Sequence, residues 1–186
     1  MGFSNDGHIS FGYCFSEGYK FPWDAEPFNG DLEYWWRHVK DYTPPFKLYG
    51  PDGEYAPGIE LLPSLKKYDK PKPKQEVIDA YYDPLLAWDK EHPVPVVLVN
   101  YCSGDYPMYI YILAVPDSVM SCSSSGYPER FDPIRLKVTF EQITAIEEFC
   151  KTYDIPTEST EENVDEGKDS YEIEGPCWWL SSFYGN

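Results

Sequence analysis

Basic side chains are scarce in this chain of 186 residues: 15 Lys and Arg residues stand against 32 Asp and Glu residues, and the formal net charge is −17. Direct binding to nucleic acid requires a basic footprint for the phosphates, and an anionic membrane surface makes the same demand. The composition therefore argues against both kinds of target. A basic protein surface remains open as the partner.

Motifs that fix a catalytic or metal chemistry are absent as well. The three histidines, at positions 8, 38 and 92, do not form the H-E-x-x-H pattern of a zinc site, and G-x-S-x-G does not occur. The stretch "SCSSSG" lacks the lysine and the glycine spacing of a phosphate-binding loop, and "NVDEGKDSYEIE" lacks the register of a calcium loop. We therefore expect no cofactor and no metal, and a non-enzymatic protein is the favoured interpretation.

The cysteines provide no framework either. They stand at positions 14, 102, 122, 150 and 177, an odd number without a C-x-x-C pair, so disulfide scaffolds and zinc ribbons are poorly supported. The longest apolar stretches, "VPVVLV" and "MYIYILAV", are too short to span a bilayer, and no signal-like apolar run follows Met1. We expect a cytoplasmic protein with reduced thiols.

Aromatic residues and prolines, in contrast, are abundant. The chain has 17 Tyr, ten Phe and six Trp residues, which supply enough surface to bury in a folded core. The 18 prolines predict short elements and long connections.

Four segments have the composition of strands. The strongest local signal is an antiparallel hairpin in which "SGD" joins residues 94–102 to residues 106–115. The other two are a first strand over residues 8–15 and a terminal strand over residues 177–185. Residues 135–140 are read either as another strand or as the lead into a helix.

Three segments have helical spacing. Residues 31–42 can be capped by Asn29 or Asp31, and residues 74–92 contain Pro84, which predicts a kink or two shorter helices. A third helix begins near Thr139, which forms a capping-box pattern with Gln142.

These elements predict an α+β fold. We expect a single domain over residues 1–186, with a mainly antiparallel sheet and two or three helices packed on one face. It includes a long irregular Pro- and Lys-rich excursion over residues 44–73 and an acidic, mobile loop over residues 154–174.

The aromatic strands raise the question of whether they form a core or a binding surface. Neither face of residues 108–115 carries a charge, which is typical of a central strand covered on both sides. Core packing is also favoured for "CWWLSSFYG", residues 177–185, with a sugar-stacking surface or an interface anchor as the alternative.

Acidic residues are concentrated in residues 154–186, which contain nine acids and one base. A solvated loop is one interpretation, and an anionic patch that docks on a basic surface is the other. Nine charges along roughly 70 Å of extended chain are too dilute to imitate duplex DNA, which carries one charge per about 1.7 Å. The candidate partner-binding residues are Asp154, Glu158, Glu161, Glu162, Asp165, Glu166, Asp169, Glu172 and Glu174. A DNA mimic would need further carboxylates on the same face, such as Asp24, Glu26, Asp31, Glu33, Asp52 and Glu54.

Three stretches together carry a resemblance: "GHISFGYCF", "NYCSGDYPMYIYI…SSGYPERF" and "GPCWWLSSFYG". In this order they resemble a group of small uncharacterised proteins of tailed bacteriophages, which share a "YPMY" strand and a terminal double-Trp strand. The resemblance covers about a third of the chain. It implies life in the cytoplasm of an infected bacterium and transfers no activity or functional residue.

The leading hypothesis is a non-enzymatic acidic protein of phage type that occludes a basic surface on a host nucleic-acid-binding defence enzyme, of the anti-restriction or anti-CRISPR kind. One alternative is a small hydrolase or transferase with a carboxylate site or a cysteine site, in which Cys14 or Cys102 pairs with a histidine. Another is a structural or assembly protein of the virion. The sequence does not fix the oligomeric state.

Overall fold

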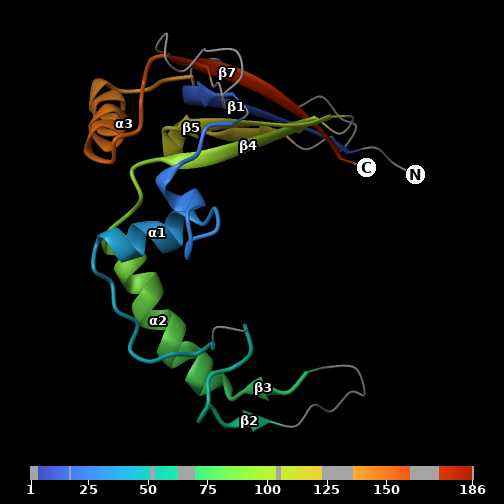
Figure 1. Ribbon diagram of the computed structural model, residues 1–186, viewed down its shortest axis with the longest axis vertical. Coiled ribbons are helices and arrows are strands. Elements are labelled where there is room, and N and C mark those ends of the chain that lie inside the picture. The colour runs from blue at the N-terminus through green and yellow to red at the C-terminus, as the bar shows by residue number, and fades with distance from the viewer. Residues whose placement is uncertain are drawn as a thin grey trace. The chain divides into compact units, whose positions relative to one another are not determined.

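The computed structural model describes residues 4–16, 18–50, 53–62, 70–103, 106–122, 136–159 and 172–185 (Figure 1). The predicted α+β class is confirmed, because the described residues form three α-helices and an antiparallel sheet. The chain separates into two compact units. Unit 1 comprises Met1–Trp35 and Pro95–Asn186, and unit 2 comprises Trp36–Val94.

Unit 1 is built around strand β1, which pairs antiparallel with three other strands (Figure 1). Strand β7 follows one edge of β1 along its length, while β6 and β5 pair with successive parts of β1 and are joined by a short 3-10 turn. Strand β4 pairs with the far edge of β5 and completes the predicted hairpin. The strands are β1 (Ser4–Phe15), β4 (Val97–Ser103), β5 (Tyr106–Ala114), β6 (Met120–Cys122) and β7 (Ile173–Gly185).

The prediction of a central strand is confirmed for the part of β5 whose side chains are described. Ile112, Leu113 and Ala114 are buried, and so is the next residue, Val115. Alternate residues of a strand point to opposite faces, so burial of consecutive side chains requires cover on both faces.

One face of the sheet carries an aromatic core. Phe15 packs against Phe21, whose ring stacks on Trp23 with 4.7 Å between centroids. Trp23 in turn contacts Trp35 and Phe149, which bring helices α1 (Leu32–Val39) and α3 (Phe140–Thr152) into this core. Burial of one such side chain contributes about 1.5–3 kcal/mol.

The opposite face of the sheet has a smaller aliphatic cluster. Val99, Ile112 and Ala114 form its buried centre, and Cys14 and Trp179 pack against them. The Trp179 indole Nε1 donates a hydrogen bond of 2.8 Å to the backbone oxygen of Gly12, which ties β7 to β1 from above the sheet.

The prediction that the terminal strand packs in the core is wrong for two of its described side chains. Cys177 is exposed and Leu180 is 80% exposed, while Trp178 and Trp179 are half-buried. Strand β7 has β1 on one edge, and within the described residues no strand pairs with its other edge. An edge strand has fewer neighbours to cover its side chains, so an apolar composition does not guarantee burial.

The predicted helices are confirmed, with caps where side chains can supply them. The Asp31 carboxylate accepts from the Tyr34 backbone N–H at 2.8 Å and caps α1. Thr139 and Gln142 form the predicted capping box of α3, so the stretch before Phe140 leads into a helix and is not a strand.

Unit 2 contains helix α2 (Gln75–Glu91), which runs as one helix through Pro84, so two shorter helices do not form. Arg37 forms a bidentate ion pair with Asp89, with N–O distances of 2.9 and 2.7 Å. Regular structure in the described part of residues 44–73 is limited to the two-residue strands β2 (Leu61–Leu62) and β3 (Lys72–Pro73) and one bridge between Tyr49 and Tyr55.

Candidate functional site

Four of the nine predicted partner-binding acids lie in the described part of the chain. Asp154, Glu158, Glu172 and Glu174 are all exposed. The other five lie outside the described residues: Glu161, Glu162, Asp165, Glu166 and Asp169.

Hydrogen bonds hold together the residues on either side of segment 160–171. The Ser159 hydroxyl accepts from the Ile173 backbone N–H at 2.7 Å and donates to the Ile173 carbonyl at 3.3 Å. Beside it, the Glu172 N–H donates to the Ser16 hydroxyl at 2.6 Å, and the Ser16 N–H donates to the Glu172 carbonyl at 2.9 Å. The residues on either side of segment 160–171 therefore meet at one end of β1, and Glu158 and Glu172 are placed at that end.

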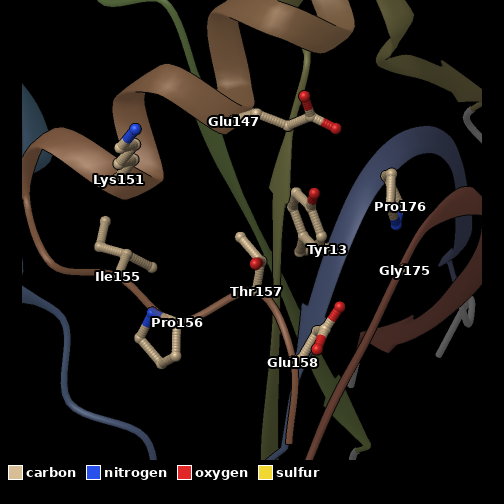
Figure 2. A pocket seen from close by; sticks show the side chains of 9 residues that line it. All are labelled: Tyr13, Glu147, Lys151, Ile155, Pro156, Thr157, Glu158, Gly175 and Pro176. Atoms are coloured by element: carbon tan, nitrogen blue, oxygen red, sulfur yellow. The ribbon is translucent and has the colours of Figure 1, made fainter.

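A cleft of about 560 Å³ lies in unit 1 and is lined by side chains from several elements (Figure 2). Tyr13 comes from β1, and Glu147 and Lys151 come from successive turns of α3. The connection after α3 supplies four more lining residues, and the start of β7 supplies two. These six are Ile155, Pro156, Thr157, Glu158, Gly175 and Pro176.

The register of β7 explains how its residues reach the cleft. Gly12 pairs with Cys177 and Cys14 pairs with Glu174, so Gly175 and Pro176 form a bulge opposite β1. Gly175 has φ +130°, a conformation that side chains rarely adopt, and a Cβ there would lie 2.6 Å from the Gly12 oxygen.

Tyr13 forms the floor of the cleft, and its surroundings are negative. The side chain is only 3% exposed, and its hydroxyl has no hydrogen-bond partner among the described residues. Burial raises the pKa of Tyr13 to about 12, and the charges of Glu147 and Glu158 add to the rise. Figure 2 shows the Tyr13 ring between these two carboxylates. Tyr13 therefore stays protonated at neutral pH and can donate or accept a hydrogen bond.

The thiols whose environment is described are poor nucleophiles. Burial raises the pKa of Cys14 to about 11 and that of Cys150 to about 12, so both remain protonated near neutral pH. His8 lies six residues before Cys14 on β1, about 20 Å away along an extended strand. The structure therefore does not bring together a Cys14–His8 couple; the side chain of Cys102 lies outside the described ones.

Among the described residues, no group of three or more His, Cys, Asp or Glu side chains is placed to hold a metal ion. In the same part of the chain, no helix is long and apolar enough to cross a membrane.

The carboxylates considered for a DNA mimic have mixed roles. Asp24 accepts from the Phe21 backbone N–H at 2.8 Å, and Asp31 caps α1. Glu54 forms an ion pair of 2.9 Å with Lys70 inside unit 2. Glu26 and Glu33 are exposed in unit 1, and Asp52 lies outside the described residues.

The formal charge is divided very unequally between the two units. Unit 1 contains 22 acidic and six basic residues, a charge of −16, whereas unit 2 contains ten acidic and nine basic residues, a charge of −1. Sequence reasoning placed the densest acidity in residues 154–186 and named acids of residues 1–35 only as further carboxylates that a DNA mimic would need. That residues 1–35 belong to the same acidic unit is visible only when the fold joins them to the later part of the chain.

Sequence reasoning also missed the cleft. Nothing in the sequence distinguishes Tyr13 from other strand residues. The only local signal of the cleft was the spacing of four residues between Glu147 and Lys151 on an exposed helix face. Comparisons with protein-family models, with curated proteins and with solved structures found no match. The candidate site therefore depends on the geometry of this chain alone.

Proposed function

We propose that the protein is a non-enzymatic binding protein that covers a basic surface of a partner protein with the carboxylates of unit 1. The observation that carries this proposal is the charge of −16 in unit 1 against −1 in unit 2. Complementary charge accelerates encounter and selects among partners. A field confined to one unit gives that unit a preference for basic surfaces.

The ion pairs within unit 2 support the same division. Arg37 pairs with Asp89, Lys70 with Glu54, and Lys74 with Glu60 at 2.8 Å. Unit 2 thus balances its acids with its own bases. In unit 1 the exposed carboxylates at the end of β1, among them Glu158, Glu172 and Glu174, have few bases in the surrounding sequence to neutralise them.

The partner we propose is a nucleic-acid-binding enzyme of a bacterial host. The basic surfaces of such enzymes are made for phosphates, and a dense set of carboxylates can compete for them. The resemblance of three sequence stretches to tailed-phage proteins supports a defence enzyme of the restriction or CRISPR kind as the target.

A lysate capture followed by a displacement assay tests this function. The protein is immobilised, proteins retained from a bacterial lysate are identified by mass spectrometry, and a retained nucleic-acid enzyme is purified with a fluorescent duplex bound to it. Addition of the protein should release the duplex, which lowers its fluorescence anisotropy. Affinity for the enzyme should fall at least about tenfold between 50 and 300 mM NaCl because salt screens exposed charges.

Matched charge variants show which unit is responsible. One variant neutralises four acids of unit 1: Asp154→Asn, Glu158→Gln, Glu172→Gln and Glu174→Gln. The control neutralises four exposed acids of α2 in unit 2: Glu76→Gln, Asp79→Asn, Asp83→Asn and Glu91→Gln. The first should slow association by about tenfold or more, and the second should leave it within about twofold. Equal effects, or retention that is independent of salt, would refute the proposal.

A further inference from the structure

The cleft at Tyr13 has the features of a site for a cationic side chain. Its rim carries two carboxylates, Glu147 on α3 and Glu158 on the following connection, and its floor is the buried ring of Tyr13. We infer that this cleft binds the guanidinium group of an arginine side chain of the basic partner. The inference rests on the proposed function, because it names the group by which that partner is held.

The walls of the cleft suit the aliphatic part of an arginine. Ile155 is buried, and Pro156 and Pro176 line the cleft beside it. These apolar surfaces can pack along the three methylene groups that carry the guanidinium. The volume of about 560 Å³ is in the range of ligand pockets and exceeds that of one side chain.

The polar groups of the cleft match the donors of a guanidinium. Arginine presents five N–H donors in a plane and accepts no hydrogen bond. Glu147 and Glu158 supply charged acceptors, and the hydroxyl of Tyr13, without a partner among the described residues, supplies a third acceptor at the floor. In Figure 2 the Tyr13 side chain lies between the side chains of Glu147 and Glu158.

Other ligand classes fit the cleft less well. A phosphate or a carboxylate would be repelled by Glu147 and Glu158, and a purely apolar ligand would gain nothing from their charge. The planar guanidinium of arginine presents several donors and can satisfy more than one acceptor, whereas the ammonium of lysine is a compact point charge, so arginine is favoured over lysine. Lys151, the remaining charged residue of the lining, stands one helical turn after Glu147 and opposes a cation.

The experiment uses the full chain and two small probes, N-acetyl-arginine amide and its neutral isostere N-acetyl-citrulline amide. Binding is measured by isothermal titration calorimetry and by NMR shifts. The arginine probe should bind with millimolar affinity, and the citrulline probe should bind at least about tenfold more weakly because it lacks the charge. An arginine-containing peptide from the partner's surface, when identified, should bind more tightly than the free amide because it adds contacts outside the cleft.

Adjacent residues of α3 provide a matched pair of variants. Glu147 lines the cleft, and Glu148 is exposed on the same helix outside it. Glu147→Gln should weaken arginine binding by about three- to tenfold, and Glu148→Gln by less than about twofold. Lys151→Gln should strengthen binding by about two- to threefold because it removes a repulsive charge. Circular dichroism establishes that each variant is folded.

Three outcomes would overturn the inference: no binding of the arginine probe, equal binding of arginine and citrulline, or equal effects at Glu147 and Glu148. If one of them occurs while the basic partner still binds in a salt-dependent manner, only the cleft assignment fails. If the arginine probe binds as expected but no basic partner is retained, the proposed function fails and the cleft remains a guanidinium site.

Discussion

The backbones of three strands approach each other at Gly12. A Cβ built on Gly12 would lie 2.0 Å from the Leu113 oxygen and 2.7 Å from the Ala114 Cα, both in β5. On the other edge of β1, a Cβ added at Gly175 of β7 would lie 2.6 Å from the Gly12 oxygen. The absence of a side chain at this one residue thus permits the close approach of β5 to β1, in which Tyr13 is the next residue.

Gly12→Ala should therefore reduce the free energy of unfolding by about 3 kcal/mol or more, since backbone atoms must move to admit the methyl group. Gly53→Ala is the control: it has φ +74° and no atom within 4 Å of the added Cβ, so it should cost only about 1–2 kcal/mol for the left-handed conformation. Urea denaturation followed by tryptophan fluorescence measures both. Equal costs for the two variants would contradict the close approach at Gly12.

Buried Cys150 predicts a loss of stability at alkaline pH. Burial raises its pKa from 9.0 to about 12, an effect that the charge of Glu147 increases. Between these values the unfolded chain releases the proton while the folded chain retains it, so stability is complete below pH 9 and falls as pH rises toward 12. The slope from one such group is about 1.4 kcal/mol per pH unit.

The measurement is the urea midpoint at several pH values between 8 and 11. Cys14 and Tyr13 also have raised pKa values, so the wild-type protein loses stability from several groups over this range. Cys150→Ala lowers stability at every pH through the cavity, but its slope should be shallower than that of the wild-type protein. Cys177→Ser, at an exposed thiol, is the control and should keep most of the wild-type slope. An unchanged slope in Cys150→Ala would show that this thiol is not the source.

At the scale of elements, helix α3 belongs to both the core and the cleft: it contributes Ile146 and Phe149 to the core and Glu147 to the cleft. Its N-terminus is fixed by the capping box, in which the Gln142 N–H donates to the Thr139 hydroxyl at 3.2 Å and the Thr139 N–H donates to the Gln142 side chain at 2.9 Å. The residue at which the helix begins depends on these local bonds, and so does the position of Glu147 relative to Tyr13.

Thr139→Ala should destabilise the protein by about 1 kcal/mol because one backbone N–H of the first turn loses its acceptor. Thr152→Ala, at the exposed last residue of the same helix, should cost less than about 0.5 kcal/mol. Thermal unfolding followed by circular dichroism compares the two. If the two threonines prove equivalent, the box does not determine the start of α3.

Features that depend on neighbouring residues could be predicted from the sequence. Features that depend on residues distant in the sequence could not. The caps of α1 and α3 and the hairpin of β4 and β5 are written in adjacent residues, so the sequence alone located them. The edge position of β7 depends on which strands pair with it, and nothing in "CWWLSSFYG" records that. The cleft depends on the convergence of residues 13, 147 and 158, which are distant in sequence. Composition alone located the acidic segment but not the carboxylate on α3.

At the scale of the whole molecule, the sequence gives the net charge, and the fold shows how that charge is divided between the two units. The formal charge of −17 is a property of the chain, but its assignment of −16 to unit 1 requires knowing that residues 1–35 and 95–186 fold together. Like charges on one compact unit repel each other in the folded state and separate when it unfolds. A surface retained for binding a basic partner should therefore reduce stability in the free protein.

Screening of this repulsion gives a direct test. Raising NaCl from 20 to 300 mM shortens the Debye length from roughly 20 Å to below 10 Å, so the urea midpoint of the wild-type protein should rise, by an amount equivalent to about 1 kcal/mol. The unit 1 variant with Asp154, Glu158, Glu172 and Glu174 neutralised should start from a higher midpoint at low salt and gain less from added NaCl. The α2 control variant should gain about as much from added NaCl as the wild-type protein, because it leaves the charge of −16 in unit 1 in place and changes unit 2 only from −1 to +3. A midpoint that is insensitive to salt, or a gain that is the same in all three proteins, would mean that the carboxylates of unit 1 are too dispersed to act together, and a docking surface built from them would lose its electrostatic basis.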